Sequence, residues 1–154
     1  MKRRNFLGMT LSTGVAATFP GNAVATALMQ SLTTVSSSIV GRTGGGDEVT
    51  IEQTALEELK GALRGNLLLS GSDGYDKARR VLNPSIDRNP ALIVQPSGAR
   101  DVSTAVTCAR ERGLLLAVKC GGHSFSGKST CDGGMQIDLS MLRGARSDAA
   151  RKRA

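Results

Sequence analysis

The sequence predicts an α/β (or α+β) domain organised around a βαβ unit, and three neighbouring patterns carry this prediction. An apolar run with β-branched residues at 91–95 lies between Pro90 and Pro96, which is typical of a buried strand. Residues 97–112 repeat apolar positions three to four apart, as an amphipathic helix does. Residues 114–119 form a second apolar run. Because strand, helix and strand follow within about thirty residues, we expect the two strands to be parallel neighbours.

Three shorter elements precede this unit. Residues 50–64 place apolar side chains at helical spacing and predict one amphipathic helix, which Gly65 ends. Residues 67–69 predict a short strand, and residues 75–82 a short helix that Asn83-Pro84 stops. These elements extend the predicted α/β pattern towards the N-terminus.

The helix over 97–112 has a well-formed start and end, and a third strand follows it. Asp101 lies in its first turn, where a carboxylate complements the helix dipole, and Gly113 stands at the C′ position. A glycine-rich loop over 120–134 then leads to a strand over 135–139. We expect this third strand to lack its later neighbours and to leave an apolar sheet edge exposed, which favours aggregation.

The N-terminal residues read as a targeting signal. In residues 1–25 a basic segment precedes a mildly apolar stretch and a small-residue cleavage site that ends at Ala25. Arg3-Arg4 resembles the twin-arginine export signal, with a general secretory signal as the alternative. We therefore expect export to the periplasm or the extracellular space, after folding around a cofactor. Residues 26–49 are rich in Ser, Thr and Gly and predict a flexible linker.

The formal charge of +7, from 20 basic and 13 acidic residues, is concentrated at the termini. Six basic residues stand there: Lys2, Arg3, Arg4, Arg151, Lys152 and Arg153. Aromatic content is 3% with no Trp, which excludes the stacking platforms of a single-strand nucleic-acid binder. No apolar run reaches the roughly 18 residues of a membrane span, so we expect no membrane anchor. Export machinery is the partner that the signal predicts.

The loop after the strand over 114–119 carries the predicted chemistry. Its candidate cofactor-binding residues are Lys119, Cys120, Gly121, Gly122, His123, Ser124 and Gly127. Two consecutive glycines at the carboxyl end of a parallel strand allow backbone N–H groups to converge on an anion, and ligands of α/β sheets gather at such ends. The spacing matches neither the Rossmann fingerprint nor the P-loop. A diphosphate is the ligand that this loop predicts.

His123, the single histidine of the chain, offers a nucleophile for an electrophilic cofactor bound in this loop. Two other interpretations compete for the same residues. Cys120, His123 and Cys131 supply three possible metal ligands, without a fourth at a convincing spacing. After export, Cys120 and Cys131 could instead form a disulfide, leaving Cys108 as a small core residue.

Several motifs in order resemble one family. They are Tyr75-Asp76-Lys77-Ala78-Arg79, Asn83, Ile86-Asp87, Pro90-Ala91-Leu92-Ile93-Val94, Asp101-Val102, Ala105-Val106, Gly121-Gly122-His123-Ser124, Cys131-Asp132-Gly133-Gly134 and Ile137-Asp138-Leu139-Ser140. Together they resemble the N-terminal part of an FAD-linked oxidase of the berberine-bridge-enzyme-like type, within the vanillyl-alcohol-oxidase group with its PCMH-type FAD-binding domain. The resemblance runs from about residue 67 to about residue 143.

The resemblance implies a cofactor and a reaction. The glycine loop would hold the FAD diphosphate, and His123 matches the histidine that bonds to the 8α-methyl of the flavin. The flavin would accept a hydride from an alcohol, sugar or amine carbon of a small-molecule substrate, and oxygen would reoxidise it with release of hydrogen peroxide. Asp132 and Asp138 are assigned structural roles.

The sequence also departs from the family. Cys120 stands where Gly or Ser is usual, and Leu82 where Trp or Phe is common. The second flavin-linking cysteine, the catalytic base and the substrate pocket would all lie downstream, so no catalytic residue is predicted in this chain. We therefore expect an incomplete, poorly folded and inactive FAD domain, with a non-enzymatic remnant or interaction module as the alternative.

Overall fold

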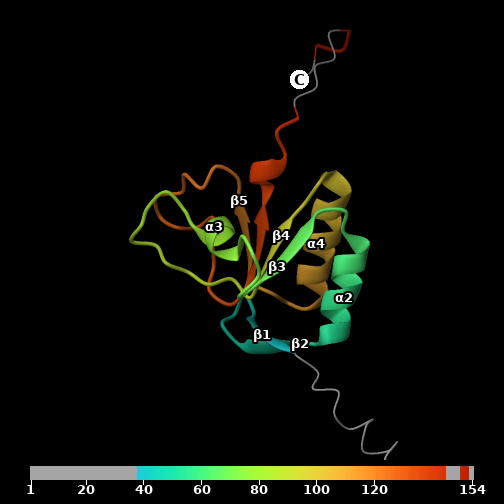
Figure 1. Cartoon of the computed structure of the whole chain (residues 1–154), viewed down its shortest axis with the longest axis vertical. Helices are drawn as coiled ribbons and strands as arrows, with labels where there is room; N and C mark the ends of the chain where they lie inside the picture. The colour runs from blue at the N-terminus through green and yellow to red at the C-terminus, as the bar shows by residue number, and fades with distance from the viewer. Residues whose placement is uncertain (1–37, 145–149, 153–154) are drawn as a thin grey trace, which may run out of the picture. The chain divides into compact units, whose positions relative to one another are not determined.

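The computed structural model describes residues 38–144 and 150–152. Its elements, in chain order, are β1 (Ile39–Arg42), β2 (Glu48–Ile51), α2 (Gln53–Ala62), β3 (Asn66–Leu69), α3 (Tyr75–Arg79), β4 (Leu92–Gln95), α4 (Ala99–Glu111), β5 (Leu116–Lys119), β6 (Met135–Asp138) and the 3₁₀ helix η1 (Leu139–Met141). The predicted signal peptide over residues 1–25 and the first part of the predicted linker lie outside the described residues. Helices and strands alternate through most of the chain, so the α/β class is confirmed (Figure 1).

A four-stranded mixed sheet forms the centre of the domain, with strand order β3-β4-β6-β5. β3 pairs with β4 in antiparallel fashion, whereas β6 lies parallel to both β4 and β5. Helices α2 and α4 lie on one side of this sheet and α3 on the other (Figure 1). The carboxyl ends of β4, β5 and β6 therefore meet at one edge of the sheet.

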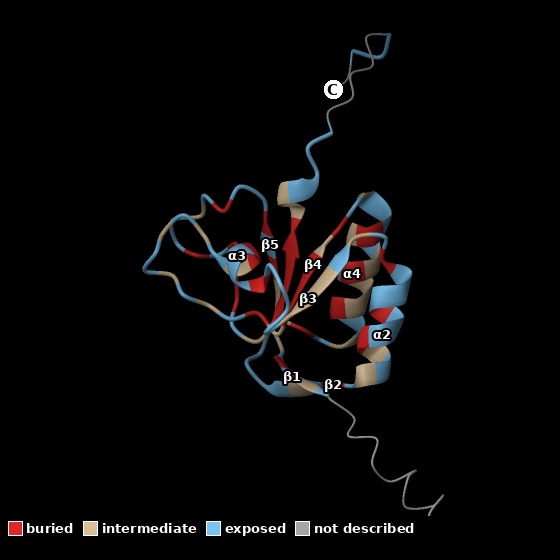
Figure 2. Ribbon diagram, in the orientation of Figure 1, coloured by how far each residue is buried: buried red, intermediate tan, exposed pale blue. Residues whose placement is uncertain are grey.

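The position of β6 corrects two predictions. The strands of the βαβ unit, β4 and β5, are parallel but not neighbours, because β6 lies between them. The third strand is consequently no exposed edge: all of its residues are buried (Figure 2). β5 is an edge strand of the sheet instead, and its Val118 is 51% exposed. Parallel pairing needs only a crossover connection, so the local pattern left open which strand would occupy the central place.

The main core lies between the sheet and helices α2 and α4. Alternate residues of the central strands face these helices, which contribute Leu56, Leu59, Ala105 and Ala109; the strand residues are Leu92, Val94, Met135 and Ile137. A smaller cluster of Leu68, Tyr75, Ala78 and Ile93 covers the opposite face. The period of two along the strands separates the two clusters. The predicted helix faces are thus confirmed in part: Leu56, Leu59, Ala105 and Ala109 pack, whereas Val106, predicted on the same face of α4, is 41% exposed.

A short hairpin corrects the predicted linker over residues 26–49 and the predicted start of the first helix. β1 pairs with β2, and Gly46 turns between them with a φ of 98°. Ile51 belongs to β2 and enters the main core, so α2 begins only at Gln53. The β-branched Ile39 and Val40 favour a strand even in a segment whose overall composition is that of a linker.

Asp101 of α4 joins three segments of the fold. Its buried carboxylate accepts the backbone N–H groups of Arg64 at 3.2 Å, Gly65 at 3.0 Å and Ser97 at 2.8 Å. The hydroxyl of Ser97 also donates to it, at 2.9 Å. These bonds, with that of the Ser97 backbone foremost, lower the pKa of Asp101 to about 2. The residue predicted to complement a helix dipole therefore also fixes the turn before β3.

The remaining predicted boundaries hold with small shifts. α3 ends at Arg79 and not at residue 82, and Gly113 adopts the left-handed conformation expected of a C′ residue, with a φ of 64°. Within the described part of the chain, no helix combines the length and apolar character needed to cross a lipid bilayer.

Candidate functional site

The carboxyl edge of the sheet brings three polar side chains into one row. The strand register aligns Lys119 of β5 with Asp138 of β6, and the next position along β4 is Gln95. The ammonium Nζ of Lys119 lies 3.6 Å from Oδ2 of Asp138, and Nε2 of Gln95 donates to the same oxygen at 3.2 Å. This polar row, in which Lys119 and Asp138 are buried and Gln95 is half-buried, marks the strand ends at which the glycine loop begins.

A cleft of about 530 Å³ opens beside this row. Its walls come from the first residues of β3, from α3 and from η1, and its floor includes Gln95, Lys119 and Asp138. A second cleft, of about 380 Å³, lies between α2 and α4 on the other face of the sheet. Of these two clefts, the first lies at the carboxyl ends of the strands, where α/β sheets usually bind ligands; Lys119, the residue before the glycine loop, lines it, but the loop over 120–134 does not.

The glycine loop presents unused hydrogen-bond donors. The backbone N–H groups of Gly121, Gly122 and His123 donate to no acceptor within the residues that the structure describes. Gly122 adopts the left-handed conformation, with a φ of 72°, which residues with a side chain rarely reach. A left-handed residue between others turns successive N–H groups towards one side, and such a turn binds anions.

The segment that follows α3 supports this loop from one side. The N–H of Leu82 donates to the carbonyl of Gly122 at 2.9 Å, and the side-chain amide of Asn83 donates to the carbonyl of Phe125 at 3.1 Å. Nη1 of Arg88 donates to the carbonyls of Gly127 and Thr130, at 3.2 and 3.1 Å. Two parts of the chain that are distant in sequence are thereby held side by side.

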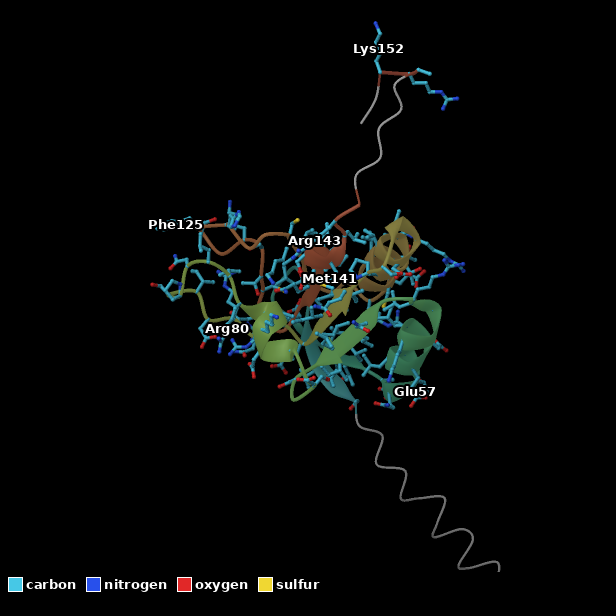
Figure 3. All side chains as sticks on the ribbon, turned by 45° about the horizontal axis from the view of Figure 1, so that its top comes forward. Glu57, Arg80, Phe125, Met141, Arg143 and Lys152 are labelled. Carbon is cyan, nitrogen blue, oxygen red and sulfur yellow. The ribbon has the colours of Figure 1, made fainter. Side chains whose placement is uncertain are left out.

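His123 is exposed, and its ring lies against Gly121. A Cβ built on Gly121 would come within 3.0 Å of the imidazole Cε1, so the absence of a side chain there leaves room for the ring. Phe125, 85% exposed, projects outward from the same loop (Figure 3). The imidazole is therefore accessible to a ligand that approaches the loop from solvent.

The other predicted site residues divide into two groups. Cys120 and Ser124 lie on the loop itself, and the Ser124 hydroxyl accepts the N–H of Lys128 at 3.1 Å. Gly127 has a φ of 72° and lies so close to Ile86 that a Cβ would come within 2.7 Å of its Cγ2. Lys119 differs, because its side chain is buried beneath the loop and its ammonium donates to the carbonyl of Ala78 at 2.6 Å.

The structure does not assemble the alternative metal set. Cys131 is buried and its thiol donates towards the carbonyl of Met135 at 3.7 Å, whereas Cys120 and His123 are exposed. Burial raises the pKa of the Cys131 thiol to about 11, so without a bound cation this thiol stays protonated at neutral pH. Both cysteines are free thiols here, and no three His, Cys, Asp or Glu residues in the described ranges group around one point.

Sequence reasoning missed three residues of this site. Asp138 had only a structural role assigned to it, Gln95 was read as the last residue of a strand, and Asn83 as a helix stop. Strand alternation places Gln95 and Asp138 on the face opposite the main core, where a polar side chain in a central strand needs a partner. That conflict with burial was the available signal for both.

The residues of the loop fit a diphosphate group. The N–H donors of Gly121, Gly122 and His123 have no acceptor in the described part of the chain, and diphosphate oxygens are suitable acceptors for such a group of donors. At the strand ends, Asp138 is buried against Lys119, whereas Asp73, which also lines the cleft, is exposed. Fold and site together define a flavin- or nucleotide-binding α/β domain.

Comparison with known proteins narrows this class. Residues 90–154 match the FAD-binding domain family. The chain is 30% identical over 93 residues to (R)-6-hydroxynicotine oxidase of Paenarthrobacter nicotinovorans, covering 60% of this chain and 20% of that protein. It is 32% identical over 73 residues to glucooligosaccharide oxidase of Sarocladium strictum, covering 46% and 15%.

Solved structures agree. Glucooligosaccharide oxidase of Acremonium strictum superposes with a TM-score of 0.56 at 26% identity, over 62% of this chain and 20% of that one. Another structure of that enzyme concerns its 6-S-cysteinyl, 8α-N1-histidyl FAD. These similarities confirm the resemblance to FAD-linked oxidases of the vanillyl-alcohol-oxidase group, and to part of their PCMH-type FAD-binding domain. It spans about a fifth of the length of the relatives it matches.

Proposed function

We propose that this chain binds FAD through the glycine loop and bonds it covalently at His123, as part of an oxidase of small-molecule alcohols, sugars or amines. When bound, FAD would supply the acceptor for a hydride from the substrate carbon, with oxygen as the final electron acceptor. The family supports the flavin and the oxidoreductase class; the histidine link, the acceptor and the substrate range are the parts that we add.

The observation that carries the proposal is the pairing of free donors with an accessible imidazole. Gly121, Gly122 and His123 present backbone N–H groups that find no acceptor among residues 38–144 and 150–152, and the His123 side chain is exposed at the same turn. The enzyme from Acremonium strictum, which shares this fold, carries a histidyl FAD. The same residues can therefore hold the diphosphate and present a nitrogen nucleophile beside it.

Each residue has a distinct part in this arrangement. The glycines remove the side chains that would block close approach to the diphosphate oxygens, and the Ser124 hydroxyl closes the loop through Lys128. The bond from Asn83 to Phe125 holds the turn that carries His123. Cys120 is exposed at the start of the loop and has no part in the proposed link.

The test is to express the full chain with FAD, precipitate it with acid and measure flavin absorbance in the washed pellet. We expect a yellow wild-type pellet, a colourless His123→Ala pellet, and a yellow Cys120→Ser pellet as the matched control. Colour that persists in His123→Ala but disappears in Cys120→Ser would place the link on the thiol. A colourless wild type would favour the alternative of a remnant or interaction module without flavin.

We also propose that the chain is exported by the twin-arginine route, on the strength of Arg3-Arg4 and the small-residue site at Ala25. Replacing both arginines by lysine keeps the charge but removes the pair. Both proteins are expressed in a bacterium with this route, and the cells are fractionated. We expect the wild type in the exported fraction and the double-lysine variant in the cytoplasmic fraction. Unchanged export of the double-lysine variant would contradict the proposal.

A further inference from the structure

We propose that Lys119 is a positioning residue, which sets the conformation of the glycine loop from below and does not touch the cofactor. The inference rests on the proposed function of that loop as the diphosphate site. It concerns the polar row of Gln95, Lys119 and Asp138, and the contact that the Lys119 stem makes with Gly122. Nothing in the pattern of the sequence distinguishes this lysine from one that would reach out towards phosphate.

The direction of the Lys119 side chain is the first step. Its side chain is 9% exposed, and its ammonium donates to the carbonyl of Ala78 in α3 at 2.6 Å. The same ammonium lies 3.6 Å from Asp138, whose side chain is 2% exposed. The charge of Lys119 is thus occupied within the protein, between a helix and a strand, and is not presented to the open side of the loop.

The Asp138 carboxylate is itself fixed, which makes it a rigid anchor. Its Oδ2 also accepts Nε2 of Gln95 at 3.2 Å, and its Oδ1 accepts the backbone N–H of Ser140 at 3.1 Å. The row therefore ties β4, β5, β6 and η1 together at their ends. A lysine in contact with such an anchor has little freedom to take another rotamer.

The stem of Lys119 forms the floor beneath Gly122. A Cβ built on Gly122 would lie 3.4 Å from Cε of Lys119, 3.6 Å from Cα of Val81 and 3.8 Å from the carbonyl of Arg80. The carbonyl of Gly122 accepts the N–H of Leu82 at 2.9 Å. The left-handed turn thus rests on the lysine stem on one side and is bonded to the segment after α3 on the other.

A charged residue suits this task better than an apolar one. An apolar side chain of equal length would fill the same space, but it could not donate to the Ala78 carbonyl or pair with Asp138. A buried carboxylate without its cation would be costly, so the pair specifies a single arrangement of the row. Because the Lys119 stem lies against Gly122, the arrangement of the row then fixes the position of the left-handed turn at Gly122.

The Leu82 amide provides a reporter for this arrangement, because its acceptor is Gly122. Hydrogen exchange of the ¹⁵N-labelled full chain, without flavin, is measured for Leu82 and for the amides of β4 and β6. In Lys119→Met we expect Leu82 exchange to rise about tenfold relative to the strand amides. Lys119→Arg, which keeps the donor, and Lys77→Met, an exposed lysine of the same cleft, should stay within about twofold of wild type.

If the ratio of Leu82 exchange to strand-amide exchange is unchanged in Lys119→Met, the residue has no effect on the loop and the proposal is overturned. An equal rise in exchange at every amide would also overturn it, because it would show a general loss of stability. If Lys119→Met does not fold, Lys119→Gln is read in the same way, because its shorter, neutral amide cannot span the row. The acid-pellet assay is run in parallel. If the wild-type pellet is colourless but the Leu82 exchange ratio changes in Lys119→Met, only the cofactor proposal is contradicted. If the wild-type pellet is yellow but this ratio is unchanged, only the positioning role of Lys119 is contradicted.

Discussion

The side-chain amide of Asn83 donates to the carbonyl oxygen of Phe125 at 3.1 Å, although 42 positions separate the two residues in sequence. Asn83 also uses its Oδ1 to accept the N–H of Ser85 at 3.1 Å. One side chain therefore shapes its own turn and fastens the outer part of the glycine loop. This relationship explains how an exposed loop without regular structure keeps a defined form.

Replacing Asn83 by Ala removes this fastening. A net hydrogen bond is worth about 1 kcal/mol, so we expect the loop to open roughly five times more often. Limited trypsin digestion, with cleavage after the exposed Lys128 followed by mass spectrometry, measures this opening. Thr43→Ala, which removes an exposed bond between the Asp47 N–H and the Thr43 hydroxyl in the turn of the β1–β2 hairpin, is the control. Equal cleavage rates in the two variants would show that the Asn83 bond does not hold the loop.

The left-handed turn at Gly122 predicts a graded series of substitutions. Ala at a φ of 72° costs about 1–2 kcal/mol, whereas Asn tolerates this region better. We expect FAD retention after gel filtration to fall in the order wild type, Gly122→Asn, Gly122→Ala. A Gly122→Ala variant that retains as much FAD as Gly122→Asn would argue against the turn as the determinant of binding.

Two glycines near the start of β3 should respond to Ala in opposite directions. A Cβ on Gly65 would lie 2.0 Å from the carbonyl oxygen of Gln95, so Gly65→Ala should destabilise the fold by about 1–3 kcal/mol. Gly61, inside α2, has open space around it, and Gly61→Ala should stabilise by about 0.5–1 kcal/mol. Urea midpoints of the two variants, measured side by side, give the signs; a shared sign would be inconsistent with the packing described.

Asp101 predicts a specific dependence of stability on pH. Its folded pKa of about 2 lies below the ordinary value of 3.8, because Ser97 and its neighbours donate to the carboxylate. A lowered pKa stabilises the fold above pH 3.8, and this contribution is lost as the pH falls towards 2. Asp101→Asn should therefore have a lower urea midpoint than wild type at pH 7 and a smaller deficit at pH 3.

Asp73→Asn, at an exposed position in the turn before α3, controls for the change in net charge. Its urea midpoint should follow that of wild type at both pH values. A deficit for Asp101→Asn that is as large at pH 3 as at pH 7 would show that the carboxylate's charge is not what the turn requires.

The elements that the sequence predicted well are those whose signal is local. The spacing of Leu56 and Leu59 predicted α2, and the apolar runs that contain Val94 and Ala117 predicted β4 and β5, because each pattern reflects the face that the element itself buries. The short strand at Ile39 was missed, since its signal is weaker than the Ser, Thr and Gly around it. Local periodicity thus recovered most elements and misjudged some of their ends.

Relations between distant residues were less accessible. The glycine loop and His123 could be recognised from the sequence, because consecutive glycines indicate an anion-binding turn and an imidazole indicates a nucleophile wherever they are placed in the fold. The direction of the Lys119 side chain towards Ala78 depends on where α3 packs. Asp138 contacts both Gln95 and Lys119 only because β6 lies between β4 and β5. Both facts arise from tertiary arrangement, and a one-dimensional pattern does not contain them.

The central place of β6 has a consequence for synthesis on the ribosome. β4 and β5 leave the exit tunnel before β6, and both lack their β6 partner until Met135–Asp138 has followed and entered between them. β6, which follows β5 in the sequence, closes this gap. Such non-local pairing is slow, because the entropy of the intervening loop is lost before the strand contacts form. Until then the nascent domain is an open half-sheet, so a pause in translation near residue 134 would prolong the interval in which chaperones or proteases reach its core.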